Sequence, residues 1–305
     1  MPIFAVALLL TSAVIHTSWN FLFKQATEKY VAMGWQVIVS GVLGVLVLCF
    51  TGLPPRFIWP FAIVSVVFEA IYYILLSLAY RDHDFSLVYP VARGAAPALV
   101  AVWTALFLSE IPTTGGLIGI VLIISGVAVI GAAGLFQSGA GLRPQRTGTG
   151  KARAGPRGAR AGKPQLKGVA IALSLSVLIS IYTLIDGYAV KHVPSLPYGL
   201  TIFALVPFLT TPVIVKRYGW RHMLEVWRVQ PIRLLLIGTL CLTAYMLVLY
   251  AYSLAPVNYS EAIREVSVVL AAFAGWQFLG EKLGKIRIIG AVVIFAGIVL
   301  IAVLG

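Results

Sequence analysis

Ionisable side chains lie inside apolar segments of this 305-residue chain, and some of them recur in an internal repeat. Arg93 aligns with Arg264, and Glu110 aligns with Glu281, at the same offset of 171 residues. An ionisable residue inside a membrane helix is costly and usually marks a pathway or a binding site. The repeated arginines are therefore candidates for binding an anionic substrate group such as a carboxylate or a phosphate. The alternative is a salt bridge that holds the two repeats together.

Glu69 is the acidic residue nearest the middle of an apolar segment, in the stretch 57–79. A carboxylate at that depth is costly unless it is paired, protonated or facing a wet cavity. Glu69 is therefore a candidate for binding a substrate amine or for carrying a proton, and the alternative is a structural hydrogen bond. Tyr72 and Tyr73 follow within one turn, so at least one of them shares the face of Glu69. Aromatic packing is the alternative role for both tyrosines.

Other polar residues in the apolar segments complete the candidate site. His16 has Asn20 one turn later, and Asp186 lies near the end of its segment, where it could simply reach water. Glu261 and Glu265 flank Arg264 closely enough for a local ion pair. Glu110 and Glu281 lie at helix ends, where caps or interface roles are favoured. The candidate substrate-binding or coupling residues are Glu69, Arg93, Arg264, His16, Asn20, Tyr72, Tyr73, Tyr89, Asp186 and Glu265.

The composition identifies the class of protein that must position these side chains. The chain is 60% hydrophobic and 11% charged, with a mean hydropathy of +0.97. A soluble domain has about 25% charged residues, so this chain has too little polar surface to face water on all sides. An all-α membrane protein is expected because the apolar runs are continuous and do not alternate as barrel strands do. Two cysteines in separate apolar segments indicate neither a disulfide framework nor a metal site.

Ten segments have close to the roughly 20 residues needed to cross a bilayer. They form two groups of five, over residues 1–136 and 168–305, on either side of a basic linker at 137–167 that we expect to be disordered. Because each repeat has an odd number of helices, the second repeat has the inverted membrane topology relative to the first. The predicted segments are 3–22, 32–50, 57–79, 86–108, 116–136, 168–190, 198–216, 231–253, 258–279 and 287–304.

The basic residues predict the orientation of the helices. The connections on the side of the linker carry 19 of the 23 lysines and arginines, whereas the opposite connections carry Arg56 and Lys191. The positive-inside rule then places the linker in the cytoplasm and both termini outside. With a single aromatic residue, Phe136, close to it, the linker is better suited to anionic lipid than to nucleic acid.

Four motifs resemble members of the EamA type within the drug/metabolite transporter superfamily. The motifs are His16-Thr-Ser-Trp-Asn-Phe-Leu-Phe-Lys24, Val88-Tyr-Pro-Val-Ala-Arg-Gly94 with Glu110, Tyr182-Thr-Leu-Ile-Asp-Gly187, and Ile263-Arg-Glu-Val-Ser267 with Gly280-Glu-Lys282. The resemblance covers nearly the whole chain outside the linker. It implies ten helices, a central cavity and transport of a small metabolite, often as export from the cytoplasm. Related ten-helix proteins are often drawn with cytoplasmic termini, opposite to the orientation that the charges predict here.

These observations together predict a secondary transporter, not an enzyme, in a bacterial-type inner membrane. The expected substrate is a small amphipathic metabolite such as an amino acid or a related organic anion, moved without any cofactor. No phosphate-binding glycine loop, His-Glu-x-x-His pair or Gly-x-Ser-x-Gly elbow is present. The alternatives are a membrane enzyme acting on a lipid-linked substrate through Glu261, Arg264 and Glu265, and a membrane scaffold that transports nothing. A scaffold would not explain Glu69. The oligomeric state is left open.

The orientation can be tested by labelling the linker. A cysteine introduced at Ser138 or Gly150 should resist an impermeant thiol reagent added to intact cells, because the linker is expected to be cytoplasmic. The unsubstituted chain, with Cys49 and Cys241, is the control. Ready labelling of the introduced cysteine from outside would contradict the predicted orientation.

Overall fold

A computed structural model describes residues 1–26, 28–82, 85–140, 163–279 and 285–304 of the chain. The first half contains α1 (Ile3–Lys24), α2 (Lys29–Thr51), the short 3-10 helix η1 (Arg56–Ile58), α3 (Trp59–Asp82), α4 (Phe85–Phe107) and α5 (Thr114–Ala140). The second half contains α6 (Lys163–Val190), α7 (Ser195–Tyr218), α8 (Trp220–Val229), α9 (Pro231–Leu254), α10 (Val257–Arg264), α11 (Val266–Leu279) and α12 (Lys285–Leu304).

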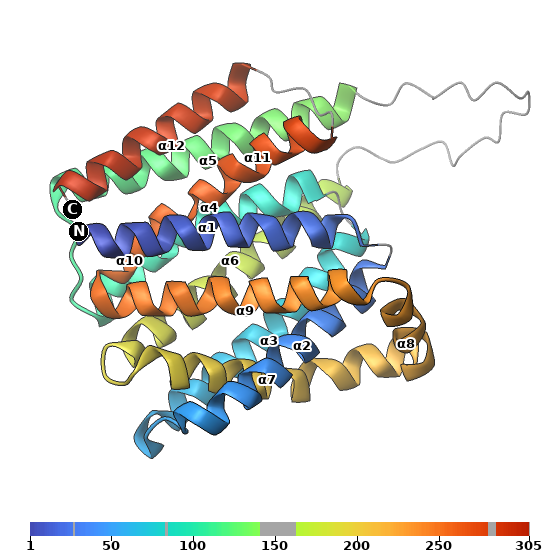
Figure 1. The fold of residues 1–305 in the computed structure, drawn as a ribbon. Helices are drawn as coiled ribbons and strands as arrows, with labels where there is room; N and C mark the ends of the chain where they lie inside the picture. Colours follow the sequence, from blue (N-terminus) through green and yellow to red (C-terminus); the bar gives the residue numbers. More distant parts are fainter. Residues whose placement is uncertain (27, 83–84, 141–162, 280–284, 305) are drawn as a thin grey trace, which may run out of the picture.

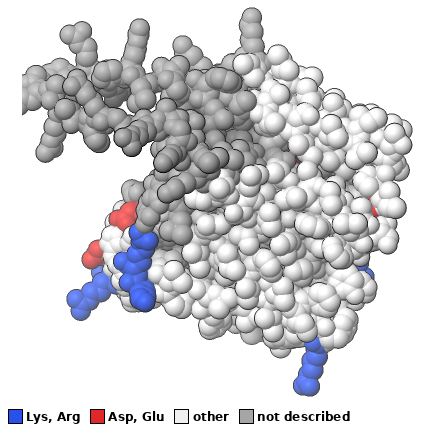
Figure 2. Space-filling view, turned by 180° about the vertical axis from the view of Figure 1, so that it is seen from behind, with Lys and Arg blue, Asp and Glu red and all other residues white. Residues whose placement is uncertain are grey.

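The described part of the chain is helical and without strands, which confirms the expectation of an all-α membrane protein. Six of its helices are long and apolar enough to cross a bilayer, and three further apolar stretches are shorter. Large apolar side chains such as Phe50, Phe208 and Phe295 stay exposed on the outside of the bundle, where lipid would cover them. Figure 2 shows one face of the bundle, on which most charged side chains gather at the two ends and a broad uncharged surface lies between them.

The two halves of the chain pack against each other along most of their length. The closest pairs across the halves are α5 with α12, α2 with α7, α1 with α9, and α6 with both α3 and α4. Figure 1 shows both termini at one end of the bundle, whereas α8 and the far end of α5 lie at the other end. The predicted linker at 137–167 lies largely outside the described residues, as does Glu281.

Glycines allow α5 and α12 to approach within backbone contact. A Cβ atom added at Gly119 would lie 2.9 Å from the carbonyl oxygen of Gly297, and one added at Gly126 would lie 2.7 Å from that of Gly290. Real side chains do not tolerate such distances, so glycine is required at these crossings, as small residues often are between membrane helices.

Two features of the second half differ from the predicted segments. The predicted helix over 258–279 is interrupted at Glu265, which lies between α10 and α11 and whose N–H bonds to Ala262 and Ile263 instead of continuing the α-helical pattern. The amphipathic helix α8 was not predicted. It follows Gly219, whose φ of 79° is in the left-handed region that favours glycine.

Helix α8 is attached to α2 and to the connection that precedes α2. The indole N–H of Trp35 donates to the carbonyl oxygen of Met223 at 2.8 Å, and the Trp35 and Trp227 ring centroids are 4.5 Å apart. The His222 ring lies 2.7 Å from a carboxylate oxygen of Glu28. This hydrogen bond raises the pKa of His222 above its ordinary value. As the pH falls, His222 becomes protonated and forms an ion pair with the carboxylate of Glu28.

The glycine contacts between α5 and α12 generate a test of the fold. Gly126→Val should lower the thermal unfolding temperature of the detergent-purified protein, because an overpacked contact costs about 1–3 kcal/mol. Ser125→Val places the same side chain at the neighbouring exposed position and is the control. Equal unfolding temperatures for the two variants would show that the close approach does not stabilise the bundle.

Candidate functional site

Ionisable side chains from both halves of the chain meet in the interior of the bundle. Each of them is at most 8% exposed, although each carries or can carry a full charge. Removing such groups from water is costly, so their partners indicate what the site can do. These residues are Glu69 on α3, Arg93 on α4, Asp186 on α6, Glu261 and Arg264 on α10, and Glu265 between α10 and α11.

One part of this interior is an arginine cluster, made of Arg93, Arg264, Glu261, Glu265 and Tyr252. Arg264 contacts Glu261, three residues earlier on α10, at 2.6 Å between Nη1 and Oε2. The Tyr252 hydroxyl donates to the same Glu261 oxygen at 2.5 Å and accepts a hydrogen bond from Arg264 at 3.0 Å. The local ion pair expected from the sequence is therefore present.

Arg93 joins the first half of the chain to the interruption between α10 and α11. Its Nε lies 3.5 Å from Oε1 of Glu265, and its Nη2 lies 3.4 Å from the hydroxyl of Ser267. Charge-assisted hydrogen bonds of this type are usually about 2.7–2.9 Å long. The pair is therefore loose, and Arg93 contacts a segment that the sequence had predicted as one regular helix.

The other part is an acidic cluster, made of Glu69, Asp186, Tyr198 and Tyr245. Asp186 accepts a hydrogen bond from the Tyr198 hydroxyl at 2.8 Å and another from the Tyr245 hydroxyl. Glu69 is an electrostatic neighbour of Asp186. Neither carboxylate oxygen of Glu69 meets hydrogen-bond geometry with a described residue. No lysine or arginine forms an ion pair with either acid within the described ranges.

Aromatic rings lie between these two clusters. Tyr182 on α6 is an electrostatic neighbour of both Glu69 and Arg264. Its ring centroid is 6.0 Å from that of Tyr72, which in turn is 5.4 Å from that of Tyr73. The centre therefore offers the faces and edges of several tyrosines beside two carboxyl groups, a combination that suits a desolvated cation.

The remaining sequence candidates occupy more ordinary places. His16 is half-buried on α1 near Arg93 and Arg264, and its ring packs edge-on against Trp19 at 5.1 Å. The Asn20 amide donates to the carbonyl oxygen of His16 at 2.8 Å, a bond within one helix. Tyr89 lies in α4, but its side chain lies outside the described residues.

Two expectations about residues near segment ends have different outcomes. Glu110 accepts a hydrogen bond from the N–H of Val257, the first residue of α10, at 2.8 Å and also pairs with Lys191. Its expected role as a cap and interface residue is confirmed. Asp186, by contrast, does not reach water as the sequence suggested, because it is 0% exposed and covered by Tyr198 and Tyr245.

Three tyrosines and one serine that complete the clusters were not predicted as site residues. Tyr198, Tyr245, Tyr252 and Ser267 have no charge and fit an apolar helix, so residue type alone did not distinguish them. The seven-residue spacing of Tyr245 and Tyr252 on α9 was an available signal, because it places both on one helix face.

The clusters together contain more acids than bases. Arg93 and Arg264 are matched by Glu265 and Glu261, which leaves Glu69 and Asp186 without a cationic partner among the described residues. The described residues contain no group of three or more metal-ligating side chains. Protons or a small organic cation would neutralise this excess of negative charge.

Comparisons with known proteins show a family match for part of the chain and a similar fold for nearly all of it. Residues 166–303 match the model of the EamA-like transporter family, which confirms the resemblance noted in the sequence. A solved crystal structure, described only as that of a protein, is similar with a TM-score of 0.72 at 15% identity over 99% of each chain, and this likeness shows the fold alone. No curated protein sequence matches. The family is one of membrane transporters of small molecules.

The Arg264–Glu261 pair can be tested by a double-mutant cycle. Arg264→Gln should destabilise the protein by about 3–5 kcal/mol, because it leaves a buried carboxylate without its cation. Adding Glu261→Gln should recover much of this loss, since no uncompensated charge then remains. Thermal unfolding in detergent measures both, and Arg228→Gln on the exposed face of α8 is the control. Additive losses would mean that the two residues are not coupled.

Proposed function

We propose that this chain, whose residues 166–303 match the EamA-like transporter family, is a secondary transporter that exports a small metabolite carrying an amine, such as an amino acid. The observation that carries the proposal is the pair of buried acids, Glu69 and Asp186, which lack a cationic partner among the described residues. A site with this charge stays stable when it holds a substrate ammonium group or protons. If substrate and protons bind to these acids in turn, their exchange couples transport to a proton gradient.

The arginine cluster supports a zwitterionic substrate over a purely anionic one. Arg264 is engaged by Glu261 at 2.6 Å and by Tyr252 at 3.0 Å, so an anion would have to displace both. The contact between Arg93 and Glu265 is longer, at 3.5 Å. In the proposed complex the substrate carboxylate binds Arg93, while its amine binds at Glu69 and Asp186 among the tyrosine rings.

We also propose that residues 1–136 and 168–305 are inverted five-helix repeats joined by the linker at 137–167. The helix contacts support this arrangement, because α1 packs on α9 as α6 packs on α3, and α2 pairs with α7 as α5 pairs with α12. The glycine contacts also support it: Gly119 meets Gly297 and Gly126 meets Gly290, although Gly119 aligns with Gly290 in the repeat. Crossed contacts of this kind arise where a two-fold axis passes between two equivalent helices.

The burial of Glu261, Arg264 and Glu265 argues against the enzyme alternative. It required Glu261, Arg264 and Glu265 at a membrane face, where a lipid-linked substrate could reach them. Glu261 and Glu265 are both 0% exposed, and Arg264 is already held by Glu261 and Tyr252. The basic connections favour a cytoplasmic linker, and the membrane that we propose is a bacterial-type inner membrane.

The role of Glu69 can be tested in proteoliposomes with an imposed pH gradient. A thermal-shift screen of amino acids and amines on the purified protein first identifies a ligand, because a ligand stabilises the state that it binds. Glu69→Gln should then lose gradient-driven accumulation of that ligand, since the amide does not titrate. If Glu69 couples protons alone, the variant retains exchange of labelled for unlabelled ligand, and if it binds the amine, exchange fails as well.

One control and one further variant make this test interpretable. Glu225→Gln removes a carboxylate of α8 whose side chain is 70% exposed, and it should leave both activities unchanged. Arg93→Ala should abolish or strongly weaken transport of a zwitterion while the protein still reaches the membrane. Unchanged accumulation and affinity in Glu69→Gln would mean that Glu69 makes only a structural contact.

A further inference from the structure

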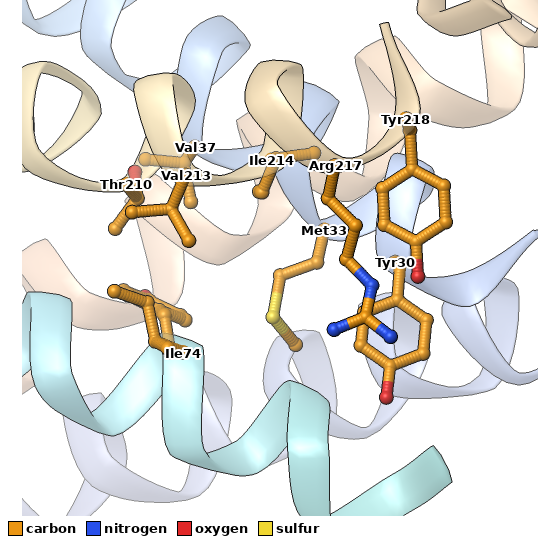
Figure 3. A pocket seen from close by; sticks show the side chains of 10 residues that line it. Tyr30, Met33, Val37, Ile74, Thr210, Val213, Ile214, Arg217 and Tyr218 are labelled. Carbon is orange, nitrogen blue, oxygen red and sulfur yellow. The ribbon is translucent and has the colours of Figure 1, made fainter.

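A groove between α2, α3 and α7 lies apart from the buried clusters. It is an open groove with about 440 Å³ of space between and in front of its walls, part of it open to the surroundings, and the walls are mostly apolar (Figure 3). The lining side chains are Tyr30, Met33 and Val37 from α2, Tyr73 and Ile74 from α3, and Thr210, Val213, Ile214, Arg217 and Tyr218 from α7.

The groove borders the surface of the bundle that faces lipid. On α7, the neighbouring Phe208, Leu209 and Val213 are 72%, 44% and 46% exposed, and all three are apolar. Thr210 lines this apolar part of the groove, and its hydroxyl donates to the carbonyl oxygen of Val206 at 3.1 Å. A polar solute would find little to bind along this length, whereas a hydrocarbon chain would bury apolar surface.

One end of the groove has the opposite character. Arg217 is an exposed residue near the end of α7, and its guanidinium carbon lies 5.7 Å from the centroid of the Tyr218 ring. Figure 3 shows its side chain extending from α7 toward the groove, beside Tyr30 and Met33. No carboxylate forms an ion pair with Arg217 in the described part of the chain.

The position of Arg217 along the bundle matches the depth of a lipid headgroup. The end of α7 adjoins α8, at the end of the bundle opposite both termini (Figure 1). Tyr30 and Tyr218, whose ring centroids are 5.7 Å apart, flank the same end of the groove. Tyrosine and arginine side chains are typical of the boundary between hydrocarbon and headgroups.

We propose that this groove binds one anionic phospholipid of the leaflet on the α8 side, with its phosphate on Arg217 and an acyl chain along Met33, Val37, Ile74 and Val213. The positive charge of Arg217 complements the phosphate of the headgroup, and the apolar walls of the groove complement the acyl chain. Tyr73 belongs both to this groove and to the helix turn that follows Glu69, so the lipid lies directly behind one wall of the proposed transport site.

The test compares phospholipids that share acyl chains but differ in headgroup charge. The full chain is delipidated in a maltoside detergent, and its thermal unfolding temperature is measured with increasing phosphatidylglycerol, phosphatidylcholine or inorganic phosphate. Phosphatidylglycerol should raise the temperature at lower concentration than phosphatidylcholine, and phosphate alone should not raise it. Equal shifts with the two lipids, or the same shift with phosphate, would overturn the proposal.

Variants localise the effect to the groove. Arg217→Gln should weaken the response to phosphatidylglycerol about fivefold, as expected for one basic residue at an anionic lipid surface. Arg221→Gln changes a nearby exposed arginine outside the groove and should respond like the wild type. The basic linker is the same in both variants, so its own attraction for anionic lipid cancels in the comparison.

A second substitution tests the acyl-chain part of the site. Val213→Trp places a large side chain in the groove from a position already 46% exposed, so the bundle core is not overpacked. It should reduce the amount of phospholipid that remains bound after delipidation, as measured by mass spectrometry. Equal retained lipid in Val213→Trp and the wild type, or equal responses of Arg217→Gln and Arg221→Gln, would overturn the assignment of the groove.

Discussion

The low dielectric of the bundle interior requires every buried charge to have a compensating partner, and the rest of the site follows from this constraint. Arg264 is satisfied within its own part of the chain by Glu261 and Tyr252. Arg93 is satisfied across the bundle by Glu265 and Ser267. Glu69 and Asp186 remain without an ion-pair partner among the described residues, although tyrosine hydroxyls donate to both carboxylate oxygens of Asp186. Such an imbalance favours substrate binding, because a site whose charges are already compensated when it is empty gains little free energy from binding a substrate.

Close contact between α5 and α12 brings the two halves of the chain together at one edge of the bundle. Because the glycines at the crossing have no side chains, the backbones of the two helices are in contact there, Gly119 with Gly297 and Gly126 with Gly290. The same halves also meet around the polar centre, where α3 and α4 pack on α6, α4 contacts α10, and α1 packs on α9 and α10. In the proposed inverted repeat, movement of one half against the other would change access to the acids without breaking the local Arg264–Glu261 pair, because both residues belong to α10.

Much of this organisation could be predicted from the residues alone, because the bilayer restricts what a chain of this composition can do. Continuous apolar runs predicted the helices, and the cost of an embedded charge identified Glu69, Arg93 and Arg264 as residues that need partners. The helix interruption at Glu265 was not predictable in the same way. Val266 and its neighbours are good helix formers in lipid, and the interruption is compensated by the contacts of Glu265 and Ser267 with Arg93, which comes from a distant segment.

The class of the protein, the positions of its helices and the identity of its costly side chains are properties of single segments, so they can be read from residue types and spacing. Which charges neutralise one another is a property of segments that are far apart in the chain, and it appears when the helices pack. Asp186 looked like a residue near water because it is close to a helix end, but Tyr198 and Tyr245 cover it from two other helices. The spacing of uncharged tyrosines shows which of them share a helix face but not their partners, because their hydroxyl groups acquire a role only when packing removes water and places a carboxylate within hydrogen-bonding distance.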